Sequence, residues 1–211
     1  MKIVLLGATG MVGSRIAAEA AARGHQLTCV SRTGKAPVPG VTSTAADAAD
    51  THRVAALAAG HDAVASALVP PRDSSDPREP FLALNRAVVD AARAADISRL
   101  VVVGGAGSLE VAPGEALVDQ PGFPAGTLGE ALAHSDVLAF YRTVGDLDWT
   151  YVSPPAEISP GERTGNFRIG GDQLLSDAEG HSRISAEDYA AAFVDELESN
   201  AHPRTRISVA Y

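Results

Sequence analysis

The fold is decided by residues 2–13, which read Lys2-Ile3-Val4-Leu5-Leu6-Gly7-Ala8-Thr9-Gly10-Met11-Val12-Gly13. The apolar run before Gly7 is typical of a buried strand, and the residues from about Met11 onward have the period of an amphipathic helix. A glycine-rich turn between them leaves backbone amides and the positive end of a helix dipole free to bind a phosphate group. The stretch therefore predicts the first strand, turn and helix of a Rossmann-type domain, with the turn binding the phosphates of a dinucleotide.

The glycine spacing alone is a weak signal. It is Gly-x-x-Gly-x-x-Gly, one residue away from the Gly-x-Gly-x-x-Gly fingerprint of dinucleotide-binding proteins, and glycines also mark purely structural turns. The context, a strand before the turn and a helix after it, favours binding. We expect the phosphates to contact Gly7, Thr9, Gly10, Met11 and Val12.

The rest of the chain alternates β-branched runs with alanine-rich helical stretches, which predicts successive βαβ units in an α/β, doubly wound parallel sheet. We expect strands at 2–6, 26–30, 41–44, 63–66, 100–103, 150–152 and 207–209, and helices at 11–23, 51–59, 80–95, 128–145 and from Ser185 onward. A chain of 211 residues predicts one domain over 1–211. Its carboxy-terminal part, residues 153–211, is rich in Pro, Gly and Arg loops and is expected to form the substrate side.

Composition argues against several classes of function. The formal net charge of -9 makes nucleic acid an unexpected partner, because a phosphate backbone requires a basic surface. The single cysteine, Cys29, cannot form an internal disulfide, and the sequence has no run of about 18 apolar residues that could span a membrane. We therefore expect a cytoplasmic protein without membrane contact, as a monomer or small homo-oligomer. The six histidines lack the spacing of metal ligands, so no metal is predicted.

The residues after the second expected strand indicate the cofactor. NAD-binding proteins place an acidic residue about 20 positions after the glycines, where it binds the ribose hydroxyls. This chain has Ser31-Arg32-Thr33 there instead. The guanidinium of Arg32, with Ser31 beside it, is suited to the 2′-phosphate of NADPH; the alternative is a solvated loop arginine. The sequence predicts NADPH.

The other strand ends should line the same crevice, because ligands of open α/β sheets lie at the carboxyl ends of the strands. Asp47, with Ala48 beside it, follows the third strand and either accepts a hydrogen bond from the adenine amine or caps a turn. Ala67 and Leu68 follow the fourth strand, and Gly104 follows the fifth. We expect these five residues to contact the cofactor.

Several stretches resemble a known family. They are residues 2–10, Gly60-His61-Asp62-Ala63-Val64, Val103-Gly104-Gly105-Ala106-Gly107-Ser108-Leu109, and the later segments 148–155 and 160–165. They resemble the atypical short-chain dehydrogenases, and within them the NADH-flavin reductase-like proteins related to biliverdin-IXβ reductase and to the NmrA-like proteins. The resemblance covers nearly the whole chain. It implies a Rossmann fold and an NAD(P)H cofactor and leaves the substrate open.

Two residues are candidates for catalysis. The resemblance implies a hydroxyl at Ser108 that bonds a substrate carbonyl or ring nitrogen; alternatively, Ser108 only ends a glycine-rich turn. The Tyr-x-x-x-Lys pair of most short-chain dehydrogenases is missing, since His134 is followed four residues later by Leu138 on the helix that should carry it. Alcohol dehydrogenation by that relay is therefore not expected. A histidine with a pKa near neutrality can protonate a reduced ring, so His134 is the second candidate, although a lone helical histidine is commonly structural.

These observations predict an NADPH-dependent oxidoreductase, an enzyme that transfers hydride to a small-molecule acceptor such as flavin or a similar conjugated ring. Such a transfer depends mainly on the positioning of the two rings. An alternative is a non-catalytic NADP(H)-sensing protein of NmrA-like type, for which a missing relay is equally expected. A nucleotide-sugar epimerase or dehydratase is a less favoured third interpretation, because the chain after Ser153 is short for a sugar domain and the relay tyrosine is absent.

Overall fold

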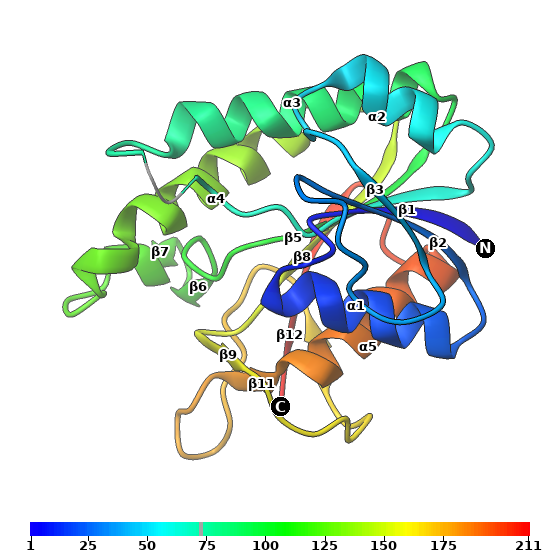
Figure 1. Ribbon diagram of the computed structural model, residues 1–211. Helices are drawn as coiled ribbons and strands as arrows, with labels where there is room; N and C mark the ends of the chain where they lie inside the picture. Colours follow the sequence, from blue (N-terminus) through cyan, green and yellow to red (C-terminus); the bar gives the residue numbers. More distant parts are fainter. Residues whose placement is uncertain (72–73) are drawn as a thin grey trace.

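The computed structural model describes residues 1–71 and 74–211, and its central feature is one sheet between two layers of helices (Figure 1). Eight strands lie in the order β10-β12-β8-β5-β4-β1-β2-β3. All neighbouring pairs are parallel except β10 with β12. The parallel strands are β1 (Lys2–Leu6), β2 (Gln26–Ser31), β3 (Thr42–Ala45), β4 (Ala63–Ser66), β5 (Arg99–Val103), β8 (Asp148–Ser153) and β12 (Thr205–Ala210), and β10 (Arg168–Gly170) is the antiparallel edge.

Helices cover both faces of the sheet. On one face lie α1 (Met11–Ala22) and α5 (Ala186–Ser199), and on the other lie α2 (Thr51–Ala58), α3 (Arg78–Ala94) and α4 (Leu128–Tyr141) (Figure 1). Side chains of β1 alternate between the two layers. Ile3 and Leu5 pack into the core under α1 and α5, whereas Val4 and Leu6 pack into the core under the other helices. Because both faces of β1 are buried, its sequence is a continuous apolar run.

The predicted doubly wound α/β sheet is confirmed, and every expected strand and helix is present with ends shifted by a few residues. The largest shift is in the helix expected over 128–145, which ends at Tyr141 because the chain then turns and buries Val144 and Leu147. Short elements were not predicted, because two or three residues show no periodicity. They are β6 (Glu110–Ala112), β7 (Glu115–Ala116), β9 (Glu157–Ser159), β10, β11 (Arg183–Ser185) and the 3-10 turns Leu117–Asp119 and Ala125–Thr127.

The strand order positions the site. β1 lies between β2 and β4, so the order reverses beside β1, where the connections after β1 and β4 cross to opposite faces of the sheet. A crevice for ligands opens at such a reversal, outside the carboxyl ends of the strands. Separately, none of the helices in residues 1–71 and 74–211 is both long and apolar enough to cross a membrane.

Candidate functional site

A cavity of about 1870 Å³ lies at the carboxyl ends of the strands. It is bordered by the segments after β1, β2, β3, β4, β5 and β8 and by one face of α4. Thirteen of the fourteen residues predicted for the site line it: Gly7, Thr9, Gly10, Met11, Val12, Ser31, Arg32, Asp47, Ala48, Ala67, Leu68, Gly104 and His134. The structure thus brings the expected cofactor residues together around one space, and it leaves Ser108 outside that lining.

The three glycines of the turn after β1 differ in what requires them. Gly7 has a φ of +74°, and a Cβ there would lie 2.4 Å from the carbonyl oxygen of Ala67. A Cβ on Gly13 would lie 2.2 Å from the carbonyl oxygen of Gly7. At Gly10 the nearest atom to a Cβ is 3.5 Å away, an ordinary contact. The fold therefore requires Gly7 and Gly13, whereas a requirement for glycine at Gly10 would come from a ligand that approaches the backbone.

The start of α1 is open to an anion. Gly10 is the N-cap and has no side chain that could accept a hydrogen bond from the first-turn amides. These amides have no partner within a helix, and the helix dipole makes the same end positive. The main-chain surface at Met11 and Val12 is therefore suited to a pyrophosphate.

The end of β2 also suits a phosphate. Ser31 is 9% exposed, and its Oγ has no hydrogen-bond partner. Arg32 is exposed beside it, and among the described residues no carboxylate lies within ion-pair distance of its guanidinium. The segment Ser31-Arg32-Thr33 therefore presents a guanidinium without a carboxylate partner and contains no acidic residue.

Asp47 realises one of its two expected roles in the structure. Its Oδ1 accepts a hydrogen bond from the backbone N–H of Ala49 at 3.0 Å, which is the turn-capping alternative. The side chain is exposed and borders the cavity, so a contact of Oδ2 with the adenine amine stays a prediction.

The glycines after β5 allow two aromatic rings to approach the chain closely. A Cβ on Gly104 would lie 2.3 Å from Cε1 of Tyr151, and a Cβ on Gly105 would lie 2.7 Å from Cβ of His134. Tyr151 was not singled out from the sequence, because it lies within β8 and its contact is with a helix 17 residues earlier.

His134 borders the cavity but is only 6% exposed. Its Nδ1 lies 3.0 Å from the hydroxyl of Tyr151, which also donates to the carbonyl oxygen of His134 at 3.0 Å, and Phe81 packs edge-on against the ring at 4.9 Å between centroids. Burial lowers the pKa of His134 to about 4. The expectation of a pKa near neutrality is therefore corrected, because a buried imidazole without an anionic partner is neutral at pH 7 and cannot act as an imidazolium acid.

Ser108 faces away from the cavity, which corrects the expectation of a catalytic hydroxyl. Its Oγ accepts a hydrogen bond from Arg206 at 3.0 Å, and its carbonyl oxygen accepts another at 3.1 Å. Arg206 is 6% exposed on β12 and is also paired with Asp172. The geometry favours the structural alternative, in which Ser108 joins the loop after β5 to β12.

Other lining residues were missed. Phe123 and Gln120 come from the loop before α4, Glu130 lies one helical turn before His134, and Glu157 lies on β9. Only Glu130 carried a sequence signal, because residues four apart on a helix share a face. The others lie on loops or on a strand too short to show a period.

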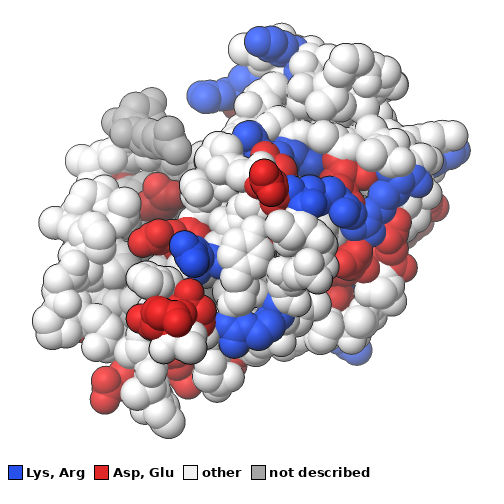
Figure 2. Space-filling view, turned by 90° about the horizontal axis from the view of Figure 1, so that it is seen from below, with Lys and Arg blue, Asp and Glu red and all other residues white. Residues whose placement is uncertain are grey.

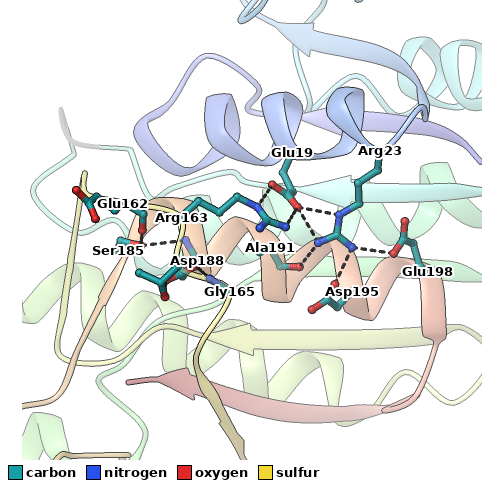
Figure 3. A network of polar contacts seen from close by, with 11 residues as sticks. Glu19, Arg23, Glu162, Arg163, Gly165, Ser185, Asp188, Ala191, Asp195 and Glu198 are labelled. Carbon is teal, nitrogen blue, oxygen red and sulfur yellow. Dashed lines mark hydrogen bonds and ion pairs between the residues drawn. The ribbon is translucent and has the colours of Figure 1, made fainter.

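The wall of the cavity formed by residues 154–159 continues into a segment that we call the strap, residues 160–167. Arg163 of the strap donates two hydrogen bonds of 2.7 Å to the carboxylate of Glu19 on α1 (Figure 3). Asp188 on α5, which has no exposed surface, accepts hydrogen bonds from Thr164 Oγ1 at 2.6 Å and from the amide of Gly165 at 2.7 Å. No strap residue lines the cavity, but these contacts fasten the chain that continues from the wall at 154–159 to α1 and α5.

Arg163 and Arg168 both bind groups of the protein itself. Arg163 pairs with Glu19, and Arg168 donates to the carbonyl oxygens of Tyr211 and Ser176. Figure 2 shows the face that carries α1 and α5, where basic and acidic side chains lie next to one another. The arginines on this face serve mostly to join secondary-structure elements.

Comparison with known proteins agrees with this geometry. A family model described as NAD(P)H-binding matches residues 7–200. A solved structure from Burkholderia pseudomallei, provisionally named an exported protein, is 53% identical, with 100% of both chains covered and a TM-score of 0.91. A structure from Bacteroides thetaiotaomicron, provisionally named an epimerase, is 37% identical and has a TM-score of 0.91, with 100% of this chain and 96% of that chain covered.

A third structure is similar over the same length. It comes from Streptococcus pneumoniae, is provisionally named an NADH-flavin reductase, and is 31% identical, with 100% of this chain and 99% of that chain covered and a TM-score of 0.85. The three names do not agree on an activity, so NAD(P)H binding rests on the family model and the reaction is left to be argued from the site.

Proposed function

This chain belongs to the NAD(P)H-binding family, and on that premise we propose that it is an NADPH-dependent oxidoreductase that transfers hydride to flavin or a similar conjugated acceptor. The observation that carries the proposal is the end of β2. There Ser31 and Arg32, whose guanidinium has no carboxylate partner among the described residues, border the cavity, where an NAD-binding protein would present a carboxylate.

The residues of the cavity would hold the dinucleotide along the strand ends. The start of α1, at Met11 and Val12, would bind the pyrophosphate, and Arg32 would bind the 2′-phosphate. Asp47 and Ala48 would border the adenine, while Gly104 would border the nicotinamide end. When bound there, the cofactor supplies a hydride.

The chain's own contribution to the chemistry is positioning. The helix face that carries the proton relay in most short-chain dehydrogenases has His134 here, which is neutral because burial lowers its pKa to about 4. Reduction of a conjugated ring needs little acid catalysis, because hydride transfer depends on two rings held face to face and water can supply the proton. The missing relay therefore favours a conjugated acceptor over an alcohol or a sugar.

The test is turnover with a panel of acceptors. Purified protein is mixed with NADPH and, separately, riboflavin, FMN and a quinone, and the loss of absorbance at 340 nm is followed, with NADH in parallel. We expect NADPH oxidation with at least one acceptor and slower oxidation of NADH. No turnover with any of the three acceptors would contradict the proposal.

A second candidate function is a non-catalytic NADP(H) sensor, which we propose as the alternative because the usual tyrosine-lysine relay is missing from α4. Tight binding of NADP⁺ and NADPH by calorimetry, without turnover on the acceptor panel, would favour it. The cytoplasmic location and the monomeric or small oligomeric state also stay predictions, and the Burkholderia relative is provisionally named an exported protein.

A further inference from the structure

The end of the cavity beside α4 differs from the end beside β2. Arg32 follows β2, whereas Gly104 follows β5, three strand positions away or about 14 Å across the sheet. Glu130 on α4 and Glu157 on β9, both exposed, border the cavity. Arg32 is the only Lys or Arg in the lining formed by residues 1–71 and 74–211. Glu130 and Glu157 therefore place two carboxylates on the cavity wall with no Lys or Arg of the described lining next to them in sequence.

The contacts of His134 fix which of its ring nitrogens carries hydrogen. The Tyr151 hydroxyl has one proton and lies 3.0 Å from both Nδ1 and the carbonyl oxygen of His134. If Tyr151 donates to that carbonyl and Nδ1–H donates to Tyr151, both contacts are hydrogen bonds. If Tyr151 donates to Nδ1 instead, its lone pairs face the carbonyl oxygen without a proton between them. The first arrangement is favoured. It leaves Nε2 without a hydrogen atom, so Nε2 can only accept a hydrogen bond.

Nε2 of His134 is placed where it can form a hydrogen bond with a ligand in the cavity. His134 is only 6% exposed and borders the cavity. Its ring makes a hydrogen bond through Nδ1, whereas Nε2 has no partner among the described residues. Nε2 is not among the fully buried unpartnered atoms of the described residues, so it is accessible at the cavity wall and can accept a hydrogen bond from a donor on a ligand. Gly105 allows the ring to come this close to the loop after β5.

We infer that the acceptor is an uncharged conjugated ring with an N–H or O–H donor, that Nε2 of His134 accepts this hydrogen, and that Glu130 and Glu157 exclude anionic acceptors. The inference rests on the proposed function, since it names the substrate class of the same site. His134 is then a positioning residue and not an acid. The acceptor gains two electrons and one proton as hydride from NADPH, and a second proton comes from water, which gives the dihydro product and NADP⁺.

Binding without turnover tests the charge selection. Protein saturated with NADP⁺ is titrated with riboflavin and with FMN, which differ by one phosphate, and flavin fluorescence quenching gives the two dissociation constants. We expect riboflavin to bind roughly tenfold more tightly or better, because bringing like charges together is unfavourable. The double variant Glu130→Gln/Glu157→Gln should reduce this ratio severalfold. Glu179→Gln, an exposed carboxylate on the turn at 177–181, is the matched control and should keep the ratio.

FMN binding as tight as riboflavin, or an unchanged ratio in the double variant, would overturn the inference even if the protein turns over both flavins. Conversely, absence of turnover with every acceptor contradicts the proposed function, while the binding ratio in the NADP⁺ complex can still be measured. The two failures are therefore distinguishable.

A second measurement tests the hydrogen bond to His134. Lumiflavin and 3-methyllumiflavin differ at the imide N–H, and the wild-type NADP⁺ complex should bind the methylated ring several times more weakly. His134→Leu should lose this preference, and His134→Gln, which keeps an acceptor oxygen, should restore part of it. Thermal unfolding of each variant checks the fold. Equal binding of the two flavins by the wild-type protein would overturn this part whatever the variants do.

Discussion

The two walls of the cavity are held by different interactions. After β1, main-chain atoms fix the turn, since a Cβ on Gly13 would lie 2.2 Å from the carbonyl oxygen of Gly7. The strap, in contrast, is held by two carboxylates. Arg163 donates hydrogen bonds to the carboxylate of Glu19, and the Thr164 hydroxyl donates one to the carboxylate of Asp188. One wall depends on the shape of the backbone and the other on the ionisation of side chains.

The difference predicts how each wall responds to solution conditions. Steric fit between main-chain atoms does not titrate and is not screened, whereas ion pairs weaken when carboxylates are protonated or salt is added. We therefore expect Gly7 and Gly13 to be intolerant of side chains under all conditions, and the strap to be the part whose stability changes with pH and salt.

The largest effect is expected for Gly13→Ala. The new Cβ would overlap the main chain at Gly7, so we expect the free energy of unfolding to fall by more than about 3 kcal/mol. Urea unfolding followed by circular dichroism measures the change.

Gly10→Ala is the matched control for this substitution. Gly10 has a φ of -71° and room for a Cβ, so the free energy of unfolding should change by less than about 0.5 kcal/mol. Affinity for NADPH, measured by calorimetry, should nevertheless fall, because the methyl group would separate the phosphates from the backbone amides. Equal losses of stability in the two variants would contradict the prediction that contacts with the main chain require glycine at Gly13 but not at Gly10.

On the strap side, Asp188→Asn is expected to lower the free energy of unfolding by about 3 kcal/mol at pH 7, because it removes a buried charge that accepts several hydrogen bonds. Burial raises the pKa of Asp188, but hydrogen bonds from Thr164, Gly165 and Tyr211 more than offset it, and the net pKa is lowered. Chemical unfolding at pH 7 gives the loss of stability.

The same carboxylate predicts a pH dependence. A lowered pKa in the folded state means that the contribution of Asp188 is complete above the unfolded pKa of about 3.9 and is lost as pH falls through the folded value. The melting temperature of the wild-type protein should therefore fall more steeply below about pH 4 than that of Asp188→Asn. Asp90→Asn, in an exposed pair with Arg93, should leave the slope unchanged; identical slopes in all three proteins would disprove the role of Asp188.

The amino-terminal wall also uses charge, at Arg32. Arg32→Gln should raise the dissociation constant for NADPH roughly thirtyfold, the equivalent of about 2 kcal/mol for a charge-assisted hydrogen bond, and should leave NADH binding nearly unchanged. Calorimetry with both cofactors measures this, and Arg53→Gln, on α2 and outside the cavity lining, is the control. An equal loss for NADH and NADPH would remove the assignment of Arg32 to the 2′-phosphate.

The amino-terminal wall could be predicted from the sequence because its determinants are local. The strand before Gly7 and the helix from Met11 have their own periods, and the residues that end neighbouring parallel strands must meet at one edge of the sheet. Arg32 and Gly104 could therefore be placed at the cavity without knowledge of any side-chain contact.

The strap and the α4 side could not be predicted in the same way. Ser185 caps the helix expected to start there, since its Oγ accepts a hydrogen bond from the amide of Asp188, but nothing local indicated that the Asp188 side chain would bind the strap. The family resemblance implied a catalytic role for Ser108, and nothing local indicates that Arg206, far along the chain, binds it. Contacts of this kind depend on how distant segments pack.

The smallest effect is expected for Arg163→Gln. Arg163 is about half exposed while its partner Glu19 is 9% exposed, so solvent screens the pair and Glu19 keeps its hydrogen bond from Arg23. We expect the free energy of unfolding to fall by about 0.5–1 kcal/mol, less in high salt. Hydrogen exchange should become faster in residues 160–167 but not in α1, whereas Arg86→Gln, an exposed arginine on α3, should change neither. Unchanged hydrogen exchange in residues 160–167 would mean that the hydrogen bonds to Asp188 are enough to keep the strap in place. The ion pair between Arg163 and Glu19 would then form because the strap lies there, without stabilising it.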